Sequence, residues 1–249
     1  MNQRDVELMQ AIMKEIGRIG AGERVLFKVP HSIIVHSNLV ILKILLDEWM
    51  KQGIFITIDR PHTYMEHLLV MQKIKNRHRL SYIDAIGDYS GSEINSVEKR
   101  AVTTTPFHIE RLPDELIKGI KNRGSVIDMK RNDFILIDNL AAMLNYNTLE
   151  DTVKFVDRYL KAIALYNSIF TALFIDSRNY PELYDAIIPL CDVELEINKK
   201  MEVKKPEMDF ENDSNVVKIN SKKKRIIRSI LLFSPDESEK KSSGKPDIL

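Results

Sequence analysis

Apolar residues in the first 198 positions of the chain follow two alternating patterns. Short unbroken runs of Val, Ile, Leu and Phe are typical of strands that are buried on both faces of a sheet. Between them lie longer stretches in which apolar residues recur every three or four positions, the spacing of an amphipathic helix. Strands that alternate with helices in this way predict βαβ units, and therefore a mainly parallel sheet with helices on both faces.

The expected elements follow from these runs and from the residues that flank them. Strands are expected at 24–29, 54–58, 80–84, 134–138, 169–175 and 193–197. Helices are expected at 1–16, 39–51, 63–75, 113–124, 148–166 and 182–188. Capping residues precede or open several of these helices: Ser37 or Asn38 before the second, Thr63 with Glu66 as a capping box, and Thr148 with Asp151.

Composition divides the chain into a core and appendages. Residues 1–22 predict an N-terminal helix with a glycine-rich turn, and 23–198 predict the α/β core. Within the core, 86–107 lack periodicity, which is typical of a functional or mobile loop. Residues 199–233 predict a basic extension with edge strands at 201–204, 216–219 and 226–233, and the polar residues 234–249 are expected to be disordered.

Charge is balanced over the whole chain but not within it. The 249 residues carry 37 basic and 36 acidic side chains, a formal net charge of +1. Residues 199–249 hold 13 basic and 9 acidic side chains, and five of the basic ones lie between 222 and 228. The core therefore has no strong field to attract nucleic acid, and any such role falls on the C-terminal extension.

Several classes of protein are excluded by what the sequence lacks. No uncharged apolar run approaches the roughly 20 residues that cross a bilayer, and no signal peptide is recognisable at the start. The single cysteine, Cys191, makes no internal disulfide and is expected on a strand as an inert buried thiol. No G-x-S-x-G nucleophile elbow is present. We expect a cytoplasmic protein without a membrane partner.

Three stretches resemble one known family. They read Gly53-Ile-Phe-Ile-Thr-Ile-Asp-Arg-Pro61, Phe134-Ile-Leu-Ile-Asp-Asn-Leu140 and Leu190-Cys-Asp-Val-Glu-Leu195. Their order and spacing resemble the RecA-like ATPases of the KaiC and RadA branch, over residues 22–197. The resemblance implies a RecA-like, P-loop NTPase-type three-layer α/β sandwich. It also implies that Asp138 matches the Walker B aspartate.

The Walker A motif is where the chain departs from this family. An active loop reads G-x-x-x-x-G-K-[ST], because glycines fold around the phosphates, the lysine neutralises their charge and the hydroxyl holds Mg²⁺. The matching residues, 31–38, have His31 and His36 at the glycine positions, Ser37 for the lysine and Asn38 for the Ser/Thr. We therefore expect a degenerate Walker A position, with neither ATP nor Mg²⁺ as cofactor.

The acidic pair that follows the family's second strand is altered too. It matches Asp59 and Arg60, so one carboxylate is kept and one charge is reversed. With these residues and the altered loop, hydrolysis by the family's mechanism is not expected, and no catalytic residue is assigned. Asp59, Arg60, His62 and Asp138 are candidates for a vestigial nucleotide site.

Each candidate has a structural alternative. Asp138 is either an inherited ligand of Mg²⁺-bound water or an acid that caps neighbouring amides. Arg60 and His62 either bind an anion, because ligands gather at strand carboxyl ends, or Arg60 neutralises Asp59 or Asp138. A metal pair of His31 and His36 with Asp59 or His62 lacks a recognisable ligand spacing, and no metal site is assigned.

The basic segment is also open to more than one interpretation. Its cations are Lys222, Lys223, Lys224, Arg225 and Arg228. They are weak candidates for gripping nucleic-acid phosphates, since no aromatic platform accompanies them. Apolar residues interrupt and follow them, which favours a solvated edge packed on the core or a docking peptide for a partner protein.

Together these patterns favour a catalytically inactive RecA/KaiC-like protein with a regulatory or scaffolding role. Because that fold family places nucleotide sites at subunit borders, the resemblance implies a protein partner or an oligomer, with an active RecA-like ATPase among the candidate partners. One alternative is a nucleotide or anion sensor without hydrolysis. Another is a nucleic-acid accessory protein that acts through its basic tail.

Overall fold

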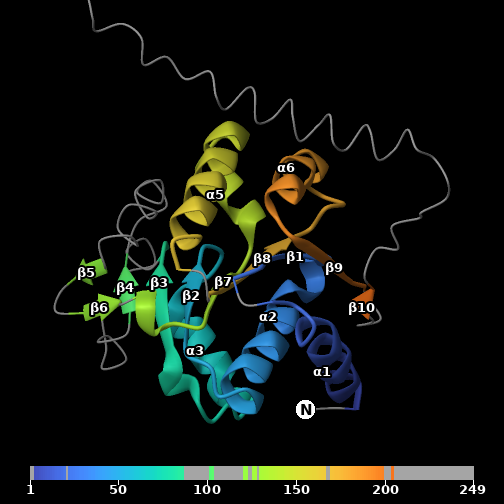
Figure 1. The fold of residues 1–249 in the computed structure, drawn as a ribbon, viewed down its shortest axis with the longest axis vertical. Coiled ribbons are helices and arrows are strands. Elements are labelled where there is room, and N and C mark those ends of the chain that lie inside the picture. The colour runs from blue at the N-terminus through green and yellow to red at the C-terminus, as the bar shows by residue number, and fades with distance from the viewer. Residues whose placement is uncertain are drawn as a thin grey trace, which may run out of the picture. The chain divides into compact units, whose positions relative to one another are not determined.

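The fold is seen in a computed structural model (Figure 1). The structure describes residues 3–20, 22–86, 101–103, 120–122, 125–127, 129–166, 169–198 and 203–204. All of them lie in Met1–Pro206, the first of two units into which the chain divides.

A mainly parallel sheet forms the centre of this unit. Its strands are β1 (Arg24–Lys28), β2 (Gly53–Thr57), β3 (Leu80–Asp84), β4 (Ala101–Thr103), β7 (Phe134–Ile137), β8 (Phe170–Ile175), β9 (Val193–Ile197) and β10 (Val203–Lys204). Their order is β10-β9-β1-β8-β7-β2-β3-β4, and every pair is parallel except β10 with β9. A separate antiparallel pair joins β5 (Ile120–Asn122) to β6 (Ser125–Ile127).

Helices cover both faces of the sheet, which makes three layers (Figure 1). One face carries α1 (Gln3–Ile16), α2 (Ile34–Lys43) and α3 (His62–Met71), and the other carries α5 (Leu149–Ile163) and α6 (Pro181–Ile187). The short 3₁₀ segments are η1 (His31–Ile33), η3 (Arg77–Arg79), η6 (Met129–Arg131), η7 (Leu140–Asn145) and η8 (Ile188–Leu190). A π-helical turn, η2 (Ile44–Glu48), directly follows α2.

Two apolar cores result, one on each face of the sheet. Successive side chains of a strand point to opposite faces. On β7, Ile135 and Ile137 pack with α5, while Phe134 and Leu136 pack on the side of α1, α2 and α3. The central strands are buried on both sides, as their unbroken apolar runs predicted.

The first crossover helix begins earlier than the sequence predicted. We expected it at 39, capped by Ser37 or Asn38, but helical structure starts at His31, and both expected caps lie buried inside α2. A carboxylate from another strand, Asp176, takes the first amide instead. The end is also earlier, at Glu48; Gly53 opens β2, where any Cβ would lie 2.4 Å from the ring of Phe134.

The predicted capping box of α3 is wrong for a similar reason. The helix begins at His62, one residue earlier, and Thr63 lies exposed within it. Its N-cap residue, Pro61, makes no side-chain cap. Asp84 at the end of β3 accepts the amide of His62, while Glu66 accepts a hydrogen bond from the Tyr82 hydroxyl.

The region between β3 and β7 differs from the prediction where it is described. The expected loop at 86–107 contains the strand β4. The helix expected at 113–124 is wrong over its last residues, because 120–122 form the strand β5. β-Branched residues at 120, 126 and 127 favour the antiparallel strands β5 and β6. Residues 87–100 and 104–119 lie outside the described ranges.

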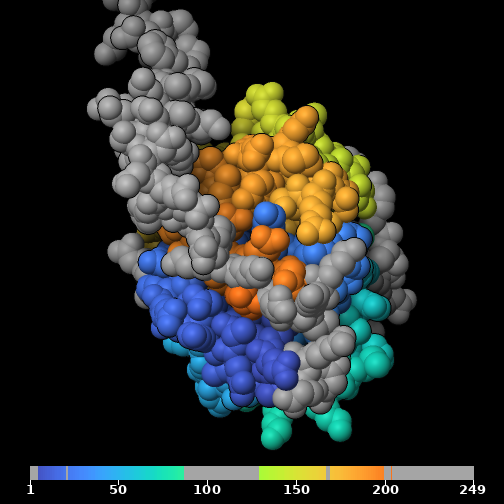
Figure 2. Space-filling view, turned by 90° about the vertical axis from the view of Figure 1, so that its right-hand side faces the viewer, coloured from blue at the N-terminus to red at the C-terminus, as the bar shows by residue number. Residues whose placement is uncertain are grey.

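Other expectations are confirmed. Thr148 caps α5 by accepting the amide of Asp151, and β3 and β9 have their predicted bounds. The first expected edge strand is present as β10, antiparallel to β9. The strands expected at 216–219 and 226–233 and the disorder expected at 234–249 lie outside the described residues. Figure 2 shows α1 in dark blue below the orange α6–β9 region on one face of the molecule.

Cys191 does not lie on a strand, contrary to the prediction. It follows η8 and precedes β9. Burial raises the pKa of its thiol to about 12, so the thiol stays protonated at neutral pH, as an inert side chain would.

In the described parts of the chain, no helix has the length and apolar character that a membrane span requires.

Candidate functional site

Aspartates line the edge of the sheet where the parallel strands end. Asp176 follows β8, Asp138 follows β7, Asp84 ends β3, and Asp59 lies two residues beyond β2. In open α/β sheets this edge is where ligands bind, because helix N-termini and loops converge there. Asp84, Asp138 and Asp176 are buried, whereas Asp59 is partly exposed.

Asp176 binds the start of the helix that follows β1. Its Oδ2 accepts the backbone N–H of His31 at 2.8 Å, although β8 and η1 are 145 residues apart in the chain. The same carboxylate accepts the amides of Arg178 and Asn179 and the side-chain amide of Asn179. A helix N-terminus attracts anions. Here the anion is a carboxylate of the protein itself.

Asp138 accepts the backbone amides that directly follow β2. Its Oδ1 accepts the amide of Ile58 at 3.0 Å, and its Oδ2 accepts the amide of Asp59 at 3.3 Å. Burial raises the pKa of Asp138 to about 7, and these amide hydrogen bonds offset only part of that rise. The carboxyl group is therefore partly protonated near neutral pH. Its geometry is that of an amide cap.

Asp84 binds the start of α3. Its Oδ2 accepts the amide of His62 at 2.7 Å and also contacts the ring Nδ1 of the same histidine, while Oδ1 accepts the amide of Ile86. Burial alone would raise the pKa of Asp84, but the hydrogen bonds from His62 and Ile86 outweigh it and lower the pKa. His62 is buried, so its ring faces Asp84 within the protein.

Asp59 and Arg60 form their own ion pair at this edge. The guanidinium Nη1 of Arg60 lies 3.1 Å from Oδ2 of Asp59, and the guanidinium carbon lies 5.9 Å from the centre of the Tyr64 ring. Arg60 is thus engaged by a carboxylate and an aromatic ring. Of the two acids that it was expected to neutralise, Arg60 pairs with Asp59, while the carboxyl oxygens of Asp138 accept backbone amides.

The residues at the Walker A position occupy helix rather than loop. β1 ends at Lys28 and helical structure begins at His31, so only Val29 and Pro30 lie between them. Ser37 and Asn38 are buried within α2, and the Asn38 Nδ2 donates to the backbone carbonyl of Asp138 at 3.1 Å. The structure therefore joins Asn38 to Asp138, two of the predicted candidates.

The candidate histidines are held apart. His31 is exposed at the helix start, His36 pairs with Asp5 of α1 at 3.0 Å, and His62 pairs with Asp84. His36 and Asp5 line a small cavity with Leu39, Val40, Lys43 and Gln72. Within the described ranges, no three His, Cys, Asp or Glu side chains are placed to hold a metal ion. The basic candidates Lys222, Lys223, Lys224, Arg225 and Arg228 lie outside those ranges.

Sequence reasoning missed Asp176 and Asp84 as parts of this edge. Each follows or ends an apolar run that was predicted as a parallel strand. That position was a usable signal, because the carboxyl ends of parallel strands share one edge. Which helix start each aspartate reaches depends on the strand order, which the runs themselves do not contain.

Comparison with known proteins yields similarity of structure and not of sequence. No known protein family matches the chain, and no curated protein matches it. An uncharacterized protein from Pyrococcus horikoshii, in complex with an unknown peptide, has a TM-score of 0.55 and 13% identity over 75% of this chain and 82% of that one.

Two further solved structures match the chain with lower scores. A KaiC-like protein from Pyrococcus horikoshii has a TM-score of 0.47 and 11% identity, over 72% of this chain and 73% of that one. The RadB recombinase has a TM-score of 0.44 and 12% identity, over 76% of this chain and 81% of that one. The predicted fold class is confirmed as a three-layer α/β sandwich with a mainly parallel central sheet.

Proposed function

We propose that this protein is a non-catalytic member of the RecA-like fold group that acts as a scaffold or regulator through assembly with other proteins. The observation that carries the proposal is the hydrogen bond from the amide of His31 to Asp176. It occupies the first amide of the helical segment that follows β1, where a nucleotide-binding sandwich of this type needs free amides for phosphate.

Bound nucleotide would have to displace the protein's own anions. Asp176, Asp138 and Asp84 already accept the amides at three exits of the sheet, and all three are buried. A triphosphate brings further negative charge beside the carboxylates of Asp176 and Asp84. Like charges at close range repel strongly where water is excluded. The two residues between β1 and η1 also leave no phosphate-wrapping loop, and a serine instead of a lysine directly precedes Asn38.

Assembly with other proteins is the role that we propose in place of nucleotide chemistry. The Pyrococcus horikoshii protein of similar fold is in complex with a peptide. Such a sandwich can hold another chain without any chemistry at the strand ends. We therefore place the function of this protein in recognition of protein partners, with an active RecA-like ATPase as one candidate.

The first experiment measures nucleotide binding directly. Purified full-length protein is titrated calorimetrically with Mg-ATP and Mg-ADP, and phosphate release is followed in parallel. We expect no binding up to millimolar nucleotide and no turnover. Micromolar Mg-ATP affinity, with turnover that Asp138→Asn abolishes, would overturn the proposal.

The same preparation separates the two alternatives. A nucleotide or anion sensor predicts a thermal shift with ATP, ADP or a cyclic nucleotide that Arg60→Ala removes; we expect none, because Arg60 is paired with Asp59. A nucleic-acid accessory role predicts salt-dependent DNA binding that is lost when 222–225 are neutralised. Co-purification of native protein with mass spectrometry then identifies the partner, with an unrelated bait as control.

A further inference from the structure

The outward face of α3 carries no carboxylate, lysine or arginine. Its exposed residues are Thr63, Tyr64, His67, Val70 and Met71. The exposed fractions are 46% for Tyr64, 49% for Val70 and 62% for Met71, which are high values for large apolar side chains. The opposite side of the helix packs on the core through Met65 and Leu69. An exposed side that groups several large apolar residues marks a candidate surface for a protein partner.

The contrast with α5 shows that this is not a general property of the domain. The exposed residues of α5 include Glu150, Asp151, Lys154, Arg158 and Lys161, the charged face of an ordinary surface helix. Single exposed apolar residues need no explanation, and Leu165 just beyond α5 is one of them. On α3, by contrast, three such residues share one short helix.

Positive charge flanks the apolar face of α3. Arg60 is neutralised by Asp59, and from Pro61 to Arg79 the chain has four basic residues and one acidic residue. That acid, Glu66, accepts the Tyr82 hydroxyl and pairs with Arg77 at 3.5 Å. Lys73, Lys75 and His78 are exposed beyond the end of the helix. The surface therefore combines apolar contacts with a basic rim.

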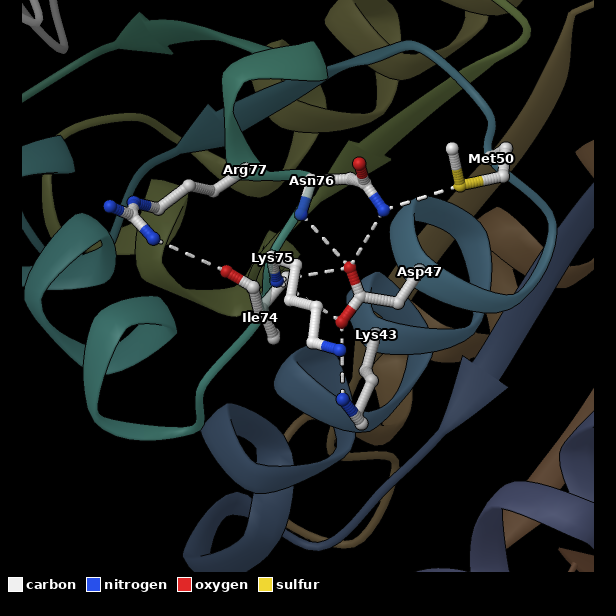
Figure 3. A network of polar contacts seen from close by, with 7 residues as sticks. All are labelled: Lys43, Asp47, Met50, Ile74, Lys75, Asn76 and Arg77. Atoms are coloured by element: carbon white, nitrogen blue, oxygen red, sulfur yellow. Dashed lines mark hydrogen bonds and ion pairs between the residues drawn. The ribbon is translucent and has the colours of Figure 1, made fainter.

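The turn that carries this rim is held in a fixed shape. Asp47 of η2 accepts the backbone amides of Lys75 and Asn76 and the ammonium of Lys43 (Figure 3). The Asn76 side chain donates to the sulfur of Met50, an apolar residue that is itself 48% exposed. Rigid presentation reduces the entropy cost of binding, which favours a surface used for recognition.

The positive charge beside α3 indicates which kind of molecule this surface binds. A second copy that met α3 symmetrically would bring like charges together, which is unfavourable. A lipid surface is a poorer match, because only three large apolar side chains protrude and none is the Phe, Leu or Trp typical of an inserting face. An acidic segment with apolar anchors satisfies both the face and its rim.

We infer that the outward face of α3, with the basic residues that follow it, is the docking surface for an acidic, apolar segment of a partner protein. The inference rests on the proposed scaffolding function, since it names the chemistry of the partner. It goes beyond that function by placing the contact on the outward face of α3, which begins beside the strand ends and extends to Met71.

Peptide display tests the inference with random sequences as the probe. A random peptide library is selected on immobilised full-length protein, and enriched peptides are titrated against variants. We expect sequences that combine Asp or Glu with aromatic or aliphatic residues. Their affinity falls at least tenfold in Tyr64→Ala with Met71→Ala, and at least tenfold in Lys73→Glu with Lys75→Glu. Leu165→Ala, at an apolar site on the other side of the sheet that is 67% exposed, leaves the affinity unchanged.

Other outcomes overturn the inference. These are an absence of peptides that depend on α3, enrichment of sequences without acidic residues, self-association in light scattering that Met71→Ala abolishes, and co-sedimentation with anionic vesicles that depends on Met71. Circular dichroism and thermal melting confirm that each variant is folded. Phosphate release from Mg-ATP is measured on the same samples, so failure of the proposed function appears as turnover and failure of the docking surface appears as unchanged peptide affinity.

Discussion

The carboxylate of Asp176 accepts the backbone N–H of His31 at 2.8 Å and so joins the end of β8 to the first turn after β1. The two residues are 145 positions apart in the sequence, and the bond forms only because β1 and β8 are neighbours in the sheet. The bond stabilises the helix start and also removes an amide from any external anion.

Loss of this carboxylate should destabilise the fold. Asp176→Ala leaves the His31 amide and the turn amides of Arg178 and Asn179 without their acceptor. Loss of a helix cap typically costs about 0.5–2 kcal/mol, and we expect the upper end because the site is buried. Urea unfolding measures the change. Asp185→Ala, at an exposed position on α6, should stay within about 0.5 kcal/mol of the wild type.

Asp138 should make stability fall as pH rises. Its pKa is raised from 3.8 to about 7 in the folded protein, because burial disfavours the charged form. Its contribution is therefore complete below about pH 4 and is lost as pH rises through about 7. Three pKa units correspond to roughly 4 kcal/mol.

The variant Asp138→Asn isolates this effect, because an amide does not titrate. The wild type should lose up to about 4 kcal/mol relative to the variant between pH 4 and pH 8. Chemical unfolding of both proteins at the two pH values gives the difference. A difference that is the same at both would contradict a buried, protonated carboxyl group at this position.

His62 should protect the protein against acid. Its ring and amide hydrogen bonds lower the pKa of Asp84 against the opposing effect of burial. The stabilisation is present above the unfolded pKa of about 4 and is lost as pH falls through the lower folded value. His62→Ala should cost about 3–5 kcal/mol, because it removes the ring that compensates the buried carboxylate. It should also move the acid-unfolding midpoint to higher pH, as circular dichroism would record. His67→Ala, at an exposed site on the same helix, should leave that midpoint unchanged.

Lys73 is a site where glycine should stabilise the protein. Its φ of 56° lies in the left-handed region, which costs a residue with a side chain about 1–2 kcal/mol. Lys73→Gly relieves this strain, and after the entropy cost of glycine we expect a gain of about 0.5–1 kcal/mol. Thermal unfolding compared with Lys75→Gly tests it, since Lys75 has no such backbone conformation and should lose stability instead.

The sequence was sufficient for elements whose signals are local. The unbroken apolar runs of β2, β7 and β8 predicted central strands, and Thr148 predicted the start of α5 through a bond within its own turn. These features depend on residues a few positions apart. The pattern of neighbouring residues is therefore enough to find them.

The starts of α2 and α3 could not be predicted in this way. Their caps, Asp176 and Asp84, come from strands 145 and 22 residues away. The sequence offered nearer polar residues, Asn38 and Thr63, as plausible caps. Tertiary packing overrode that local preference. The antiparallel strands β5 and β6 were missed because Pro113 suggested a helix, while their β-branched residues fitted a strand.

The sequence predicted several residues of the candidate site but few of the contacts between them. Asp138 proved to cap amides, which was one of its two alternatives, and Arg60 proved to pair with Asp59. His36 pairs with Asp5 of α1, and no sequence motif indicated this pair. Long-range pairs of this kind follow from the packing of helices, which residue spacing alone does not specify.

The wide turn of η2 has a consequence for insertions and deletions. A π-helical turn holds one residue more than an α-helical turn of the same backbone path. Deleting one residue between 44 and 46 would restore regular helix pairing but rotate Asp47 by about 100° around the axis. The shortened helix would be more regular by itself, while the turn before β3 would lose the carboxylate that orders it. Evolutionary length changes in this stretch are therefore constrained by a segment that follows it by nearly thirty positions.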